Sequence, residues 1–158
     1  MTDIPTYEVY AIRYAEQLER ADGATYLGGD PTRMIRGLDF FTYAIIGNGQ
    51  TFVVDTGFNP DLSGEGGRNF LESPAESLSK IGIKASSVEH VLLTHAHFDH
   101  IGHSDQLRKK TGATIHLQKD DLFLYNLLPQ QALFFGETVL SADPVDAFIE
   151  DNELFKSC

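Results

Sequence analysis

One short stretch, an apolar run followed by a group of ligand-type side chains, constrains the fold of this chain more than any other. The apolar residues 91–93 lead directly into His95, His97, Asp99 and His100, which we call the histidine cluster. Side chains two apart on a strand point to the same face, so His95 and His97 can reach one metal ion together. After the strand ends, a turn can bring Asp99 and His100 toward a second position beside the first. The pattern therefore predicts a metal site at the end of a strand.

The donor types in the histidine cluster suit a divalent transition metal. Neutral imidazole nitrogens and a carboxylate are ligands for zinc, and also for iron, manganese or cobalt. A chance grouping and a solvated polar loop are the alternatives. Four ligand-type side chains within six positions, at the mouth of an apolar run, favour metal binding over both.

A second apolar segment ends in an acidic residue. Residues 40–47 and 50–55 are rich in β-branched and aromatic side chains, and Asn48-Gly49 between them is typical of a type I′ turn. The pattern predicts a hairpin whose second strand ends at Asp55. Packing alone does not explain an acid at this place, because an unpaired buried carboxylate is costly. A turn-forming or helix-capping role is the alternative for Asp55.

The rest of the chain alternates between strand and helix patterns, which predicts helices packed on a mixed sheet in the α/β (α+β) class. Ser73, Pro74 and Glu76 form the start of a helix with a capping box, and Gly82 ends it. The other expected segments are a strand at 7–14, a long surface loop at 15–39, a loop at 58–72, a strand at 90–94, a helix at 104–110, a strand at 113–118, a helix at 119–128 and a last helix opening at 143–146.

Charge and composition exclude several classes of function. The formal net charge of −11 opposes nucleic acid as a partner, because phosphate backbones repel such a surface. No apolar run approaches the roughly 20 residues that a membrane span needs, and the N-terminus lacks the basic and apolar parts of a signal peptide. A cytoplasmic location is therefore expected. The single cysteine, Cys158, rules out an internal disulfide.

The order Thr-His-x-His-x-Asp-His-x-Gly at 94–102 resembles the signature of the metallo-β-lactamase superfamily of di-metal hydrolases. With Phe98 in its middle and Ile101-Gly102 after it, the motif is similar to the N-acyl homoserine lactonase branch. The resemblance also takes in 51–57, where a hydrophobic strand ends in Asp-Thr-Gly. It implies an αβ/βα sandwich, of which this chain covers roughly the first half.

This resemblance implies a site and a reaction. Two divalent metal ions, zinc before iron, manganese or cobalt, are held by the histidine cluster, and Asp55 supports the ligands from behind. A hydroxide shared by the two ions attacks a small-molecule lactone or related acyl ester, as in quorum quenching. Asp99 ligates the second ion and passes a proton toward the leaving alkoxide. Phe98 contacts an apolar part of the substrate; a core aromatic beneath the motif is the alternative.

The family pattern also has three later ligands that are not evident here. It adds a third histidine, a bridging aspartate and a final histidine after the cluster, whereas His116 is the last histidine of this chain. The acids Asp143, Asp146 and Asp151 lie in a helical pattern without a matching Gly-His context. Residues 1–158 are therefore expected to form a single domain that is the N-terminal part of a longer protein.

Other interpretations stay open at this point. A complete short homologue could bind one metal weakly, or complete its site with a second subunit in a homodimer. Thioester, β-lactam and phosphate or sulfate ester hydrolysis share the same metal chemistry. A catalytically inactive metal-binding fragment or interaction module is the alternative from a different class.

Overall fold

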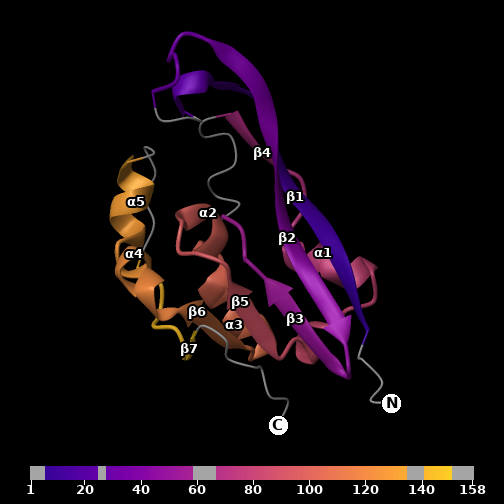
Figure 1. The fold of residues 1–158 in the computed structure, drawn as a ribbon. Coiled ribbons are helices and arrows are strands. Elements are labelled where there is room, and N and C mark those ends of the chain that lie inside the picture. Colours follow the sequence, from indigo (N-terminus) through magenta and orange to yellow (C-terminus); the bar gives the residue numbers. More distant parts are fainter. Residues whose placement is uncertain (1–5, 25–27, 59–66, 135–140, 151–158) are drawn as a thin grey trace.

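The structure, a computed structural model, describes residues 6–24, 28–58, 67–134 and 141–150. In this part of the chain, seven strands form one mixed sheet in the order β4-β1-β2-β3-β5-β6-β7 (Figure 1). The neighbours from β4 to β3 pair antiparallel, and those from β3 to β7 pair parallel. The strands are β1 (Tyr7–Ala21), β2 (Met34–Gly47), β3 (Gln50–Val54), β4 (Arg68–Phe70), β5 (His90–Leu93), β6 (Thr114–Gln118) and β7 (Ala147–Ile149).

The tight hairpin predicted at Asn48-Gly49 is confirmed. Both residues have positive φ, 51° and 77°, as a type I′ turn requires, and Gly47 pairs with Gln50 across it. This turn sets the register that brings the end of β3 to Asp55.

The long loop predicted at 15–39 is wrong for most of its length. β1 continues to Ala21 and β2 begins at Met34, so the two strands form an arm that extends well past the end of β3 (Figure 1). Gln17 pairs with Leu38 on one side and with Arg68 of β4 on the other. The residue after it, Leu18, is 73% exposed. An arm held by cross-strand pairing, with apolar side chains in solvent, shows little of the burial pattern from which strands are predicted.

The α-helices follow local sequence signals where those signals are strong. In α1, the Ser73 hydroxyl accepts from the N–H of Glu76 at 3.3 Å, and the Glu76 carboxylate accepts from the N–H of Ser73 at 3.3 Å. The predicted capping box is thereby confirmed. The helices of the described residues are α1 (Pro74–Lys80), α2 (Phe98–Ile101), α3 (Ser104–Thr111), α4 (Leu122–Asn126) and α5 (Leu128–Phe134), with 3₁₀ turns η1 (Asp22–Ala24), η4 (Ala85–Ser87) and η5 (Lys119–Asp121).

Two helix predictions near the end of the described chain are wrong in their bounds or type. The helix expected to end at Pro129 is split into η5, α4 and α5, and Pro129 is the second residue of α5, where a missing N–H is tolerated. The segment expected to open a last helix instead leads into β7. Its Asp146 accepts from Ile115 N–H at 2.8 Å and donates its own N–H to the Ile115 carbonyl at 3.0 Å, which aligns the chain with β6. Among the described residues, none of the helices has the length and apolar character needed to cross a membrane.

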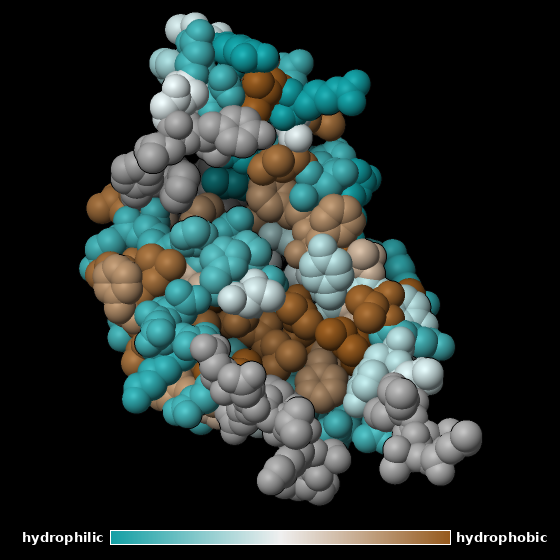
Figure 2. Space-filling model, in the orientation of Figure 1, coloured by the Kyte–Doolittle hydropathy of each residue, from teal (hydrophilic) through white to brown (hydrophobic). Residues whose placement is uncertain are grey.

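The two faces of the sheet differ in burial. Val53, Val91 and Ile115 lie side by side on one face and are at most 1% exposed; they belong to the core into which α1 and α3 also place leucines. The opposite face, which we call the open face, carries Tyr43 and Val9, which are 39% and 64% exposed. Figure 2 shows hydrophobic side chains gathered below the centre of the view, in the region where Figure 1 draws β3 and the strands beside it.

Candidate metal centre

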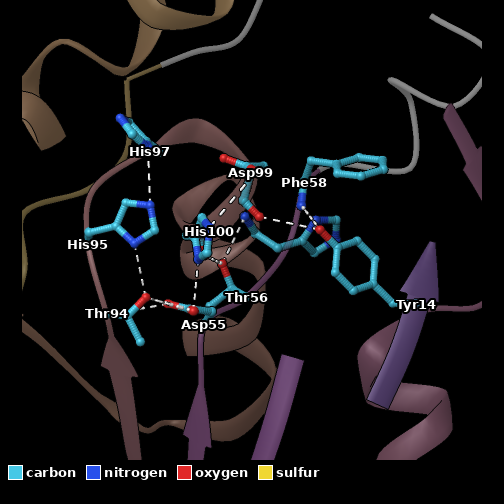
Figure 3. A network of polar contacts seen from close by, with 10 residues as sticks. Tyr14, Asp55, Thr56, Phe58, Thr94, His95, His97, Asp99 and His100 are labelled. Atoms are coloured by element: carbon cyan, nitrogen blue, oxygen red, sulfur yellow. Dashed lines mark hydrogen bonds and ion pairs between the residues drawn. The ribbon is translucent and has the colours of Figure 1, made fainter. Parts of the chain in front are cut away.

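The histidine cluster lies at the edge of the sheet where the parallel strands β3 and β5 end (Figure 3). The chain leaves β5 after Leu93, passes His95 and His97 in a loop, and enters the single turn of α2, which carries Asp99 and His100. His97 is the extended residue before this turn, with φ −75° and ψ 149°. The change from strand to turn is what lets four nearby residues approach one another.

The structure brings the three imidazoles together. His95 Nε2 and His97 Nδ1 are 3.0 Å apart, and the ring centroids of His95 and His100 are 3.9 Å apart. The Asp99 carboxylate lies 3.8 Å from His100 Nε2. Among the described residues, these side chains are not arranged around one common point as three or more metal ligands would be. Their role as ligands therefore stays a prediction.

The donor set nevertheless fits a divalent cation. Two nitrogens bonded to zinc at about 2.0–2.1 Å with tetrahedral angles are roughly 3.3–3.4 Å apart. The 3.0 Å between His95 and His97 is within a few tenths of an ångström of this separation. Loss of the proton that lies between these two nitrogens, with small rotations of the half-buried His95 ring and the exposed His97 ring, would aim both lone pairs at one ion.

Asp55 stands behind the cluster and is almost fully buried, at 4% exposed. It follows β3 with a left-handed φ of 59°, which aspartate tolerates better than most residues. Its Oδ2 lies 2.8 Å from His100 Nδ1, and its Oδ1 accepts from the N–H of Thr94 at 2.9 Å. A carboxylate can only accept, so His100 carries its proton on Nδ1 and keeps the lone pair on Nε2. Support of a bound metal by Asp55 stays a prediction.

Thr94 connects Asp55 to the imidazole of His95 and thereby fixes the position of the proton on that ring. The Thr94 hydroxyl is 2.8 Å and 2.9 Å from the two Asp55 oxygens, so its hydrogen points to the carboxylate. The same hydroxyl is 3.1 Å from His95 Nδ1, and it can only accept there. The proton of His95 is therefore placed on Nδ1, and its Nε2 lone pair faces His97 (Figure 3).

The pKa values of two cluster histidines shift in opposite directions. Burial, followed by the neighbouring imidazoles, lowers the pKa of His95, so this ring is neutral near pH 7. Burial also lowers the pKa of His100, but the hydrogen bond and charge of Asp55, with the charge of Asp99, outweigh it, and the net pKa is raised. The same carboxylate therefore orients His100 and favours its protonated form when no cation is bound.

Thr56, which follows Asp55, fixes the position of α2 through hydrogen bonds. Thr56 donates its N–H and its hydroxyl to the His100 carbonyl at 2.7 Å and 2.8 Å. The hydroxyl also accepts the N–H of His103 at 3.2 Å. Gly57 follows with φ 76°, and a Cβ at this position would lie 2.7 Å from the ring of Tyr14. Close approach and backbone conformation both require glycine here.

Tyr14 is a site residue that the sequence did not reveal. It projects from β1, is 1% exposed, and donates its hydroxyl to the Asp99 carbonyl at 3.3 Å while accepting from Phe58 N–H at 3.3 Å. Burial raises the pKa of Tyr14 well above its usual value, so the hydroxyl stays a donor. The strand pattern could have placed Tyr14 in the core, but its contact spans 85 residues.

Phe98 points into the protein and is 6% exposed. The guanidinium carbon of Arg68 lies 5.3 Å from the centre of its ring. This is the position of a core aromatic beneath the motif, which was the alternative to a substrate contact. The predicted contact with substrate is therefore not evident in this arrangement, and it stays a prediction.

The histidines outside the cluster have other surroundings. His90 is half-buried, stacks on Phe52 at 5.2 Å between ring centroids, and lies 3.1 Å from His116. His103 precedes α3. A cavity of about 120 Å³ between α1 and α3 is lined in part by Asp55 and His103. Cys158 and Asp151 lie outside the described residues.

Comparison with known proteins supports the family resemblance. The family model described as Metallo-beta-lactamase superfamily matches residues 40–155. Hydroxyacylglutathione hydrolase GloC of Haemophilus influenzae is 40% identical over 62 residues, 39% of this chain and 27% of the relative. A UPF0173 metal-dependent hydrolase of Staphylococcus aureus is 49% identical over 35 residues, 22% of this chain and 15% of the relative.

Solved structures match more of the chain at lower identity. A quorum-quenching N-acyl homoserine lactone lactonase has a TM-score of 0.66 at 18% identity, covering 90% of this chain and 56% of its own. The FEZ-1 metallo-beta-lactamase of Legionella gormanii has a TM-score of 0.55 at 20% identity, covering 72% and 41%. At these identities the likeness shows the fold alone. The chain spans about half the length of these structures, and its matches cover 27% and 15% of the two curated relatives.

Proposed function

The chain belongs to the metallo-beta-lactamase superfamily, and from that premise we propose that it carries metal ligands of a divalent-cation-dependent hydrolase. The predicted α/β fold of this superfamily is confirmed by the matched structures. The observation that carries the proposal is the gathering of three imidazoles and Asp99 at one edge of the sheet, with Asp55 behind them.

Hydrogen bonds of Asp55 and Thr94 determine which ring nitrogen of His95 and of His100 carries the proton. Asp55 holds the Nδ1 proton of His100 directly, and that of His95 through Thr94, so both Nε2 lone pairs stay available. Second partners of this kind orient ligand rings and increase their basicity. A bound divalent cation would supply Lewis acidity and an activated water for hydrolysis. We propose two such ions, zinc first, with His95, His97, Asp99 and His100 among their ligands.

Asp99 is proposed to ligate the second ion and to pass a proton to the leaving group. Its side chain is 31% exposed, so a substrate and solvent can reach the carboxylate. The Tyr14 hydroxyl holds the carbonyl of Asp99 itself, and Thr56 holds the carbonyl of the next residue, His100. A carboxylate on a fixed backbone keeps the short reach that proton transfer needs.

A small-molecule lactone or related acyl ester is the proposed substrate. The likeness of the fold to an N-acyl homoserine lactone lactonase over 90% of this chain supports this choice. The second candidate is a hydroxyacyl thioester of glutathione, which the 40% identity to a hydroxyacylglutathione hydrolase over 62 residues favours. Remaining ligands are proposed to come from further chain, where the family pattern has them, or, as an alternative, from a second subunit.

Metal content and hydrolysis test the proposal together. The 158-residue chain, and any longer protein that contains it, is loaded with zinc, desalted, and assayed for bound ion and for hydrolysis of an acyl homoserine lactone, a hydroxyacylglutathione and a β-lactam. We expect bound zinc, and we expect His97→Ala to lose it, whereas the exposed control Lys109→Ala retains it. Zinc-free wild-type protein after loading would refute the proposal.

A further inference from the structure

Gln131 connects α5 to the loop that carries the histidine cluster. Its Nε2 donates to the Ala96 carbonyl at 2.9 Å and to the Leu124 carbonyl at 2.7 Å. Ala96 is the residue between His95 and His97, and none of its surface is exposed. One amide group therefore joins the peptide between two proposed metal ligands to α4.

The chemistry of a glutamine suits this double contact. A side-chain amide carries two N–H hydrogens on one nitrogen and can serve two carbonyls at once. A glutamate of the same length has no hydrogen to offer when ionised, and a methionine has none in any state. The neighbouring residue Ala132 is 0% exposed, and Leu128 is 3% exposed, so α5 is anchored in the core on the side from which Gln131 reaches the loop.

The hydrogen bond between Gln131 and the Ala96 carbonyl affects the distance between the imidazoles of His95 and His97. Rotation of the peptide at Ala96 swings the Cα atoms of His95 and His97 relative to each other, and the rings follow. The 3.0 Å between the ring nitrogens thus depends on the orientation of a carbonyl that Gln131 holds. Asp55 and Thr94 fix His95 and His100 from behind, whereas within the described residues the ring of His97 has its hydrogen-bond contact with His95 alone.

We infer that Gln131 is a positioning residue for the metal site: it fixes the Ala96 peptide so that His95 and His97 bind one cation together. The inference rests on the proposed function of the cluster, and it adds a residue from a helix 35 positions downstream of the loop. Gln131 is not proposed as a metal ligand. It acts through the backbone.

Zinc affinity of the 158-residue chain tests this role. Gln131→Met keeps the length of the side chain and removes both donors, and we expect it to weaken zinc binding by about 10–100-fold, as the loss of partners behind a ligand typically does. Leu133→Ala is the matched control, because its side chain is 71% exposed on the same helix and has no bond to Ala96; it should bind zinc within about twofold of the wild type. Gln131→Asn, which withdraws the amide by one methylene, replaces Gln131→Met if that variant does not fold.

A metal-free measurement accompanies the titration. The carbonyl ¹³C resonance of Ala96 should shift in Gln131→Met and stay unchanged in Leu133→Ala, whose side chain is exposed on the same helix. Wild-type zinc affinity in Gln131→Met would overturn the positioning role while leaving the proposed metal site intact. Failure of the wild-type chain to take up zinc would overturn both.

Discussion

Replacing Asp55 by asparagine isolates the carboxylate behind the cluster. Asparagine can still accept the N–H of Thr94, but its amide places a donor against the Nδ1–H of His100. Two donors cannot bond, so the proton of His100 has to move to Nε2, the nitrogen that faces the cluster. The variant is therefore expected to lose zinc affinity by about 10–100-fold.

The same substitution also destabilises the fold, because it removes the charged hydrogen bond between Asp55 and His100. A hydrogen bond to a charged group is worth about 1.5–3 kcal/mol, and a donor that faces another donor adds a desolvation penalty. Relief of burying the Asp55 charge offsets part of this loss, which leaves about 2 kcal/mol of destabilisation. With a urea slope of about 2 kcal/mol/M, the unfolding midpoint should fall by about 1 M. The exposed control Asp120→Asn should leave the midpoint unchanged.

The destabilisation by Asp55→Asn is expected to depend on pH, because Asp55 changes the pKa of His100. Asp55 raises the pKa of His100 in the folded chain, so the stabilisation from protonating His100 is present below its unfolded pKa and is lost as pH rises through the folded pKa. In the presence of a chelator, the stability difference between wild type and Asp55→Asn should therefore be larger at about pH 5.5 than at about pH 8.5. Equal urea midpoints for both proteins at both pH values would refute the ion pair.

Two further predictions concern the scaffold of the site and are measured by urea unfolding. Gly57→Ala should destabilise the fold by about 2–4 kcal/mol, because residue 57 has a φ of 76° and its new Cβ would lie 2.7 Å from the buried ring of Tyr14. Gly49 has nearly the same φ but open space around it, so Gly49→Ala should cost about 1 kcal/mol. Equal losses for the two glycines would contradict the steric argument. Ile115→Ala, at a fully buried position, should cost about 2–5 kcal/mol, whereas the 71% exposed Leu133→Ala should change stability by at most about 0.5 kcal/mol. A small loss at Ile115 would mean that the core beneath β6 is loosely packed.

Local chemistry made parts of this molecule predictable from its sequence. The turn at Asn48-Gly49 and the capping box at Ser73 each depend on residues within four positions of one another. The position of the histidine cluster at the end of a strand follows likewise from a short motif. Where the signal and the structure occupy the same few residues, pattern and fold agree.

Interactions between distant segments explain the features that the sequence did not predict. The outer half of β1 is held by pairing with β2 and β4 rather than by burial of Leu18. β7 forms because Asp146 bonds to Ile115, although Asp-Pro before it is also a common helix start. The reach of Tyr14 to Asp99 depends on how β1 packs beside α2. None of these interactions is encoded in a periodic pattern of one segment.

The open face has a practical consequence for how unfolding of this chain can be followed. Fluorescent dyes such as ANS respond to exposed apolar surface, and the folded chain already offers Tyr43 and Val9 on one side of its sheet. A dye-based melting curve should start bright and report poorly on the loss of the core. The chain has no tryptophan to serve as an internal reporter. Far-ultraviolet circular dichroism is therefore the suitable signal.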